Sequence, residues 1–137
     1  MTTFVTRAPL DSPATVLDAA ALARLRELDP EGRAGVVPRV MRTFEHSLAK
    51  TLAALRQAAE SRDLAELRRL AHTLKSSSAS IGAMELSAAC ARLESLARDR
   101  LGAQIPEALV QLLTAGTQAQ AAVSALLASP EKSPRIG

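Results

Sequence analysis

The sequence is poor in the residues that build β-sheets and disulfide frameworks. Its 137 residues include no tryptophan, no tyrosine, two phenylalanines and one cysteine. A single cysteine excludes an internal disulfide, and the shortage of aromatic residues argues against a sheet protein because these side chains are enriched in strands. No apolar run is long enough to span a bilayer, and the opening MTTFVTRAPLDSPATV has no signal-peptide pattern. We therefore expect a cytoplasmic protein that does not act on membranes.

The composition favours one helical domain with a mildly basic surface. Hydrophobic residues make up 47% of the chain, and most of them are alanine, leucine and valine. Alanine and leucine are strong helix formers, and 137 residues suit a single domain. The formal net charge of +3 suits an acidic partner. Because the basic residues are scattered and no aromatic side chains lie among them to stack on bases, we do not expect nucleic-acid binding.

Four long segments carry apolar residues at alternating steps of three and four. This spacing places the apolar side chains on one face of a helix. Such helices bury their faces against one another when short turns connect them. The four stripes run through residues 37–59, 64–81, 86–97 and 105–126.

A shorter helix is expected before these four, over residues 19–28. Asp18 can cap its first turn, and Leu22, Leu25 and Leu28 share its apolar side. The prediction is therefore an all-α fold, an antiparallel four-helix bundle with a short additional N-terminal helix that lies across one end.

The two ends of the chain lack the apolar spacing of the helical segments. Residues 1–14 and 129–137 combine proline, serine and charged residues without helical periodicity. We expect a flexible lead-in and a flexible tail there, and a bundle domain over residues 15–128 between them.

The predicted core contains a few residues of special interest. Phe44, Met84 and Cys90 are expected to be buried, with Cys90 acting as a small apolar group. Ser78 falls on the apolar stripe of its helix, where its hydroxyl could donate to the carbonyl of Leu74.

The stretch AHTLKSSSASIGA, residues 71–83, places polar residues on the outside of a predicted helix. At about 100° per residue, His72 lies roughly 130° from the centre of the apolar stripe and so faces solvent. Arg68, Lys75 and Ser76 lie three or four residues away and share this face. The small residues Ala65 and Ala79 lie one turn further out, which leaves room for another protein to approach.

An exposed imidazole among cations suits the chemistry of phosphoryl groups. An unperturbed histidine has a pKa of about 6.5, so much of it is a neutral nucleophile near neutral pH. The cations Arg68, Arg69 and Lys75 should favour the neutral ring and stabilise an attached phosphoryl group. The same helix offers no carboxylate base at helical spacing and no second histidine or cysteine for a metal. We expect a phosphoryl carrier without an ATP site or catalytic activity of its own.

The same residues resemble a known signature. AHTLKSSSASIGA is similar to the pattern H-x-[LF]-K-[GS]-[SA]-[SA] of histidine-containing phosphotransfer (HPt) domains of two-component phosphorelays, and the likeness in helix order and turn placement extends over residues 28–98. By this resemblance, His72 is the phosphorylated histidine, Lys75 contacts the phosphoryl group and Gly82 ends the helix. Ser76 stands where the family more often has glycine.

The resemblance also implies partners and a reaction. His72 would accept a phosphoryl group from the aspartate of one receiver domain and pass it to another. The partners would be response-regulator receiver domains and a hybrid histidine kinase, with Mg²⁺ bound by the receiver and no cofactor in this chain. We expect a monomer whose receiver-docking surface consists of Ala65, Arg68, Arg69, Ser76 and Ala79.

Two other functions are compatible with a helical bundle. One is an interaction module that binds a partner without being phosphorylated. The other is an all-α enzyme of the chorismate-mutase kind, which would need charged side chains pointing into the core, whereas the predicted stripes are apolar. His46 is also expected to be exposed, but Ala49 stands where the lysine of the motif would be required, so we interpret it as a surface histidine.

Overall fold

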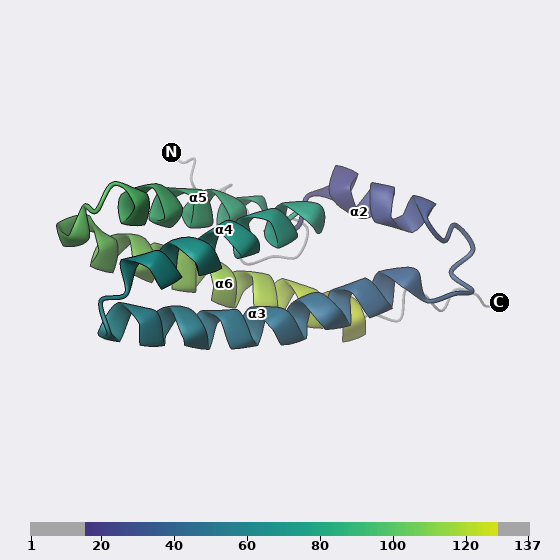
Figure 1. Cartoon of the computed structure of the whole chain (residues 1–137). Coiled ribbons are helices and arrows are strands. Elements are labelled where there is room, and N and C mark those ends of the chain that lie inside the picture. The colour runs from purple at the N-terminus through teal and green to yellow at the C-terminus, as the bar shows by residue number, and fades with distance from the viewer. Residues whose placement is uncertain (1–15, 129–137) are drawn as a thin grey trace, which may run out of the picture.

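The chain forms a bundle of antiparallel helices. The structure, a computed structural model, describes residues 16–128, so the predicted lead-in and tail lie outside the described residues. In Figure 1 the four long helices lie side by side and reverse direction at each turn. This confirms the predicted all-α bundle. The elements are α2 (Ala19–Glu27), α3 (Val36–Glu60), α4 (Leu64–Ser80), α5 (Met84–Arg98), the 3₁₀ turn η2 (Gly102–Gln104) and α6 (Ile105–Ala128).

Capping side chains set the starts of two helices. The Asp18 carboxylate accepts a hydrogen bond from the Ala21 backbone N–H at 3.0 Å, and Asp63 accepts one from the Glu66 backbone N–H at 3.1 Å. Each bond satisfies a backbone donor that has no partner within its own helix. The cap predicted for the short helix is therefore confirmed, and Asp63 caps α4.

Gly82 joins the end of α4 to the start of α2. Its φ of +87° is a left-handed conformation that only glycine adopts freely, and its carbonyl accepts a hydrogen bond from the Asp18 N–H at 2.8 Å. A Cβ at this position would lie 2.8 Å from that same nitrogen. The short helix α2 therefore starts where α4 ends. Figure 1 shows it running beyond the ends of α4 and α5, alongside the first part of α3, rather than lying across the end of the bundle.

The core is almost entirely aliphatic. Phe44 and Cys90 are buried as predicted. Two predictions are wrong: Met84 is 50% exposed because it is the first residue of α5, and Leu28 is 68% exposed because it follows the last turn of α2. The largest fully buried side chains are those of Leu17, Met41, Leu48, Leu55, Leu67, Leu86, Leu93, Leu112 and Val123.

Among the described residues, Ser78 is the one polar residue that is buried. The predicted hydrogen bond from its hydroxyl to the Leu74 carbonyl is not formed. Its Oγ has no hydrogen-bond partner within the described part of the chain. The neighbouring Ser77 hydroxyl donates to the Leu74 carbonyl instead, at 3.3 Å. The core of the described bundle therefore contains no charged residue, which does not fit an enzyme that works inside it.

No helix between residues 16 and 128 combines the length and the apolar character that crossing a membrane requires.

Candidate functional site

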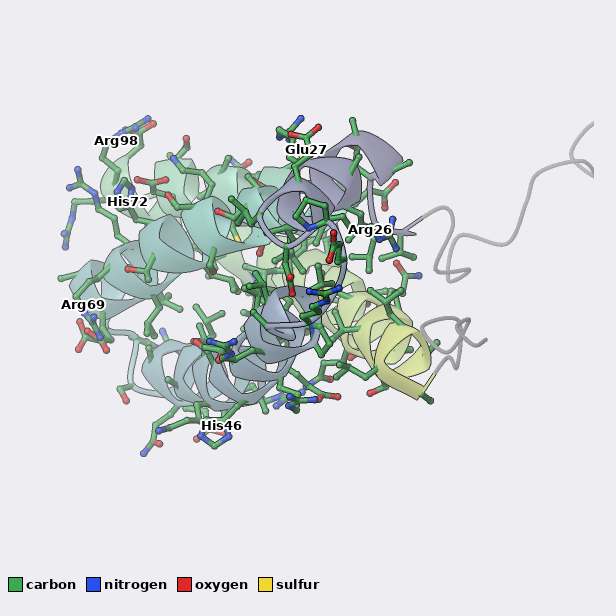
Figure 2. The ribbon with its side chains drawn as sticks, turned by 90° about the vertical axis from the view of Figure 1, so that its right-hand side faces the viewer. Arg26, Glu27, His46, Arg69, His72 and Arg98 are labelled. Carbon is green, nitrogen blue, oxygen red and sulfur yellow. The ribbon has the colours of Figure 1, made fainter. Side chains whose placement is uncertain are left out.

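His72 lies in the middle of α4 on its solvent side. Its side chain is 63% exposed, and Figure 2 shows it projecting from the bundle. The neighbouring Ala71 and Leu74 are buried, so the helix carries the imidazole outward while its opposite face packs into the core. The exposed position predicted for His72 is confirmed.

A carboxylate from the next helix holds the imidazole. Glu94, in α5, has one oxygen, Oε2, 2.8 Å from His72 Nδ1, and its other oxygen, Oε1, accepts a hydrogen bond from Lys75 Nζ at 2.7 Å. The Glu94 side chain is only 14% exposed, whereas that of Lys75 is 35% exposed. One largely buried carboxylate therefore fixes two polar side chains that reach the surface.

This hydrogen bond determines which ring nitrogen is free. An ionised carboxylate only accepts hydrogen bonds, so in the neutral ring the proton resides on Nδ1 and Nε2 keeps its lone pair. The hydrogen bond from Lys75, together with the one from His72, holds the pKa of Glu94 below the usual glutamate value. Glu94 therefore stays ionised near neutral pH, and Nε2 is the ring nitrogen that keeps a lone pair facing away from this carboxylate.

Sequence reasoning missed Glu94 because it searched for carboxylates on the same helix only. His72 lies ten residues before Gly82 and Glu94 lies twelve after it, so a tight antiparallel turn at this glycine brings the two level with each other. Glu94 also directly follows Leu93, which is fully buried, and therefore starts from the edge of the core. The positions of the turn and of the α5 stripe were the signals that could have found it.

Two further residues of α5 adjoin the site. The Ser87 hydroxyl donates to the Lys75 backbone carbonyl at 3.0 Å and so ties α5 to α4 beside the site. Cys90 lies one turn before Glu94 and is fully buried. Burial, with a smaller contribution from the Glu94 carboxylate, raises the pKa of the Cys90 thiol to about 12. This thiol is therefore a packing group rather than a second nucleophile.

The residues predicted to dock a partner lie around His72 on α4. Ala65, Arg68, Arg69 and Ser76 are exposed, and Ala79 is half-buried. In Figure 2, Arg69 and Arg98, a residue that the sequence argument did not single out, project on the same side of the molecule as His72.

The cations near His72 are less free than the sequence suggested. Arg69 donates two hydrogen bonds to the Glu66 carboxylate, at 2.9 and 2.6 Å, which lowers the pKa of Glu66. Arg98 donates to Asp99 at 3.1 Å, whereas Arg68 makes no salt bridge within residues 16–128. Of the three cations expected near the ring, Arg69 and Lys75 are therefore paired with carboxylates. Glu94, which the sequence argument did not include, contacts the ring itself.

Among residues 16–128, no three or more histidine, cysteine, aspartate or glutamate side chains lie together in a way that could hold a metal ion. An exposed, oriented imidazole beside an ammonium group can instead exchange a group with another protein.

Comparisons with known proteins agree with this arrangement. The model of the Hpt domain family matches residues 39–128, a range that contains His72, Lys75 and Glu94. The crystal structure of histidine-containing phosphotransfer protein B (HptB) from Pseudomonas aeruginosa PAO1 is similar at 26% identity and a TM-score of 0.75, covering 83% of this chain and 96% of that one. No curated protein sequence matches the chain. The chain thus belongs to the Hpt-domain family, whose members act with receiver domains and histidine kinases in two-component systems, and it has a histidine phosphotransfer role in a phosphorelay.

Proposed function

We propose that His72 accepts a phosphoryl group from the aspartate of one receiver domain and passes it to the aspartate of another. The observation that carries this proposal is the exposed imidazole whose Nδ1 bonds to Glu94 at 2.8 Å. It leaves Nε2 as the nitrogen that can attack phosphorus.

The transfer step requires no atom or proton from solvent. The Nε2 lone pair of His72 forms the N–P bond, the P–O bond to the receiver aspartate breaks, and the aspartate leaves as a carboxylate. The proton on Nδ1 stays in place, so the phosphorylated ring carries a positive charge. Glu94 lies against that nitrogen and stabilises the charge, because a hydrogen bond between ionised groups is stronger than a neutral one.

Lys75 stabilises the phosphoryl group in this proposal. An ammonium group has three N–H donors, and one of them bonds Glu94 Oε1. The remaining donors are free to bind phosphoryl oxygens on Nε2 of the neighbouring His72. Glu94 thus keeps the ammonium group close to the ring both before and after transfer.

The partner supplies the rest of the chemistry. The receiver binds Mg²⁺, and this chain contributes no cofactor of its own. The receiver docks over the surface predicted above. We further propose that a hybrid histidine kinase is the source of the phosphoryl group and that this chain works as a monomer in the cytoplasm.

Mixing the protein with a phosphorylated receiver tests the proposal. We expect a phosphate that is labile in acid and stable in base to appear on the wild-type chain and to be absent from His72→Gln. The exposed His46 provides a matched control, since His46→Gln should accept phosphate as the wild type does. Equal labelling of wild type and His72→Gln would place the phosphate on another residue and contradict the proposal. Absence of label from both proteins would favour the alternative, a non-phosphorylated interaction module.

A further inference from the structure

A groove lies at the end of the bundle where α2, α3 and α6 meet. Its volume is about 510 Å³, within the range of protein binding pockets. Its lining combines the apolar side chains of Val37, Met41, Leu126 and Leu127 with basic side chains that include Arg42. We call this pocket the end groove. Its size and lining suit one or two large apolar side chains.

The side chains that line the end groove carry a small excess of positive charge. Glu31 pairs with Arg33 at 3.1 Å. Asp29 accepts the Val36 backbone N–H at 3.2 Å but stays ionised, so it offsets one of the two arginines that line the groove. The loop N–H groups, that of Val36 above all, also lower the pKa of Asp29. The two arginines that line the groove, Arg26 and Arg42, make no salt bridge within residues 16–128.

A row of basic side chains continues from the end groove along α3. Arg42, His46 and Lys50 repeat every four residues, and the shallow hollow that they line also contains three hydroxyl side chains, those of Thr43, Ser47 and Thr51. We call this row the α3 basic row. It is about 12 Å long at 1.5 Å per residue.

No carboxylate of α3 forms a salt bridge with the α3 basic row among the described residues. Between residues 39 and 51 the single carboxylate is that of Glu45, and its Oε2 accepts a hydrogen bond from the Ser124 hydroxyl at 2.6 Å. The row makes no salt bridge with any other described residue. By contrast, carboxylates pair with Arg69, Lys75 and Arg98 on the His72 side.

We propose that the end groove and the α3 basic row together bind an acidic amphipathic helix of a partner protein. Apolar side chains of that helix fill the groove, and carboxylates spaced four residues apart pair with the row, because such residues share one face of a helix. A bilayer fits less well, since the large exposed apolar residues of the described chain do not lie on α3. Nucleic acid fits less well because no exposed aromatic side chain borders the row.

This surface is separate from the phosphoryl-accepting side chain. In Figure 2, His46 and His72 project from different sides of the bundle, and Arg26 lies at the end that faces the viewer. A helix bound along α3 therefore leaves His72 free for a receiver, so the chain can hold two proteins at once. The inference goes beyond the proposed function and does not depend on it.

A synthetic helical peptide tests this surface. We would use about 18 residues, which span about 27 Å as a helix, with two leucines near one end and glutamates at every fourth position. Binding is measured by calorimetry and by backbone amide chemical shifts in the unphosphorylated protein. We expect the shifts to map to residues 37–51 and 126–127, and a peptide with serines in place of the leucines to bind at least about tenfold more weakly.

Matched variants separate this surface from a general effect of charge. Arg42→Glu with Lys50→Glu should weaken peptide binding by about tenfold or more, whereas Arg24→Glu with Arg92→Glu changes the net charge equally and should weaken it by less than about twofold. In the Leu127→Gln variant the preference should reverse, so that the peptide with serines binds more tightly than the peptide with leucines. Melting curves by circular dichroism confirm that each variant is folded.

Three results would overturn the inference. They are shifts centred on His72, equal weakening by both double variants, and binding of phosphatidylserine vesicles or a 20-base-pair DNA duplex more tightly than the peptide. Phosphorylation of Arg42→Glu/Lys50→Glu by the small donor phosphoramidate should match the wild type. Failure of the peptide experiment is thereby distinguished from failure of the phosphotransfer proposal.

Discussion

Replacing Glu94 by glutamine tests how the site orients its nucleophile. Glu94→Gln keeps the shape of the side chain and removes the charge that bonds His72 Nδ1 at 2.8 Å and Lys75 Nζ at 2.7 Å. Hydrogen bonds to charged groups contribute about 1.5–3 kcal/mol, against about 0.5–1.5 kcal/mol for neutral ones. A net loss of about 1 kcal/mol at the exposed ring corresponds to roughly a fivefold smaller preference for the tautomer with its proton on Nδ1.

The tautomer can be read from the ¹⁵N chemical shifts of the imidazole at pH 8, where an ordinary imidazole is neutral. We expect Nδ1 to be the protonated nitrogen in the wild type, a mixture of tautomers in Glu94→Gln, and a roughly fivefold to tenfold slower uptake of phosphate from a phosphorylated receiver. Glu85→Gln, the same change at an exposed position of α5, should leave both unchanged. Identical ring shifts in wild type and Glu94→Gln would show that Glu94 does not select the tautomer of His72.

Three further predictions concern the bundle around the site. Gly82→Ala should destabilise the fold by about 2–4 kcal/mol in urea unfolding, because a Cβ would lie 2.8 Å from the Asp18 nitrogen. Gly32→Ala, at φ +73° with open space around it, should lower the unfolding free energy by only about 1 kcal/mol. Equal losses in the two variants would contradict the close contact at Gly82. Ser78→Ala should stabilise the protein by on the order of 1 kcal/mol because it removes a buried hydroxyl without a partner in the described chain, and a loss of stability would mean that the hydroxyl is bonded. Cys90, whose pKa is raised to about 12, should resist iodoacetamide at pH 8 until the protein is unfolded, and alkylation of the native protein at the rate of a free thiol would show that it is not buried.

The lowered pKa of Glu94 also links the site to acid stability. A carboxyl group whose folded-state pKa is depressed stabilises the protein above its ordinary pKa, and this contribution is lost as the pH falls through the folded-state value. The difference in unfolding free energy between wild type and Glu94→Gln should therefore persist above the ordinary glutamate pKa of about 4.3 and disappear in more acidic solution.

Periodicity predicted the bundle because each helix buries one continuous stripe. The steps of three and four from Met41 to Leu55 specify a face regardless of the neighbouring helix, and the exposed position of His72 follows from the same geometry. The two burial predictions that failed lie where helices end. Leu28 and Met84 continue the apolar spacing of their helices, but among residues 16–128 no neighbouring element covers the end of α2 or the first residue of α5.

Only the part of the site that lies on α4 was predicted from the sequence. His72, Arg68 and Lys75 share α4, so their common face could be derived from the angle per residue. Glu94 belongs to α5, and its position opposite His72 depends on the turn at Gly82 and on the register of two packed helices. Pair contacts such as these are set by tertiary packing, and spacing along a single helix does not encode them.

The most direct test of the account is to identify which nitrogen of His72 carries the phosphoryl group. The protein, labelled with ¹⁵N in its histidines, would be phosphorylated by its receiver and examined by ¹⁵N and ³¹P NMR in alkaline solution. We expect a phosphorus–nitrogen coupling to Nε2 of His72 and a proton retained on Nδ1 beside Glu94. Phosphorus bonded to Nδ1, or to any residue other than His72, would contradict it.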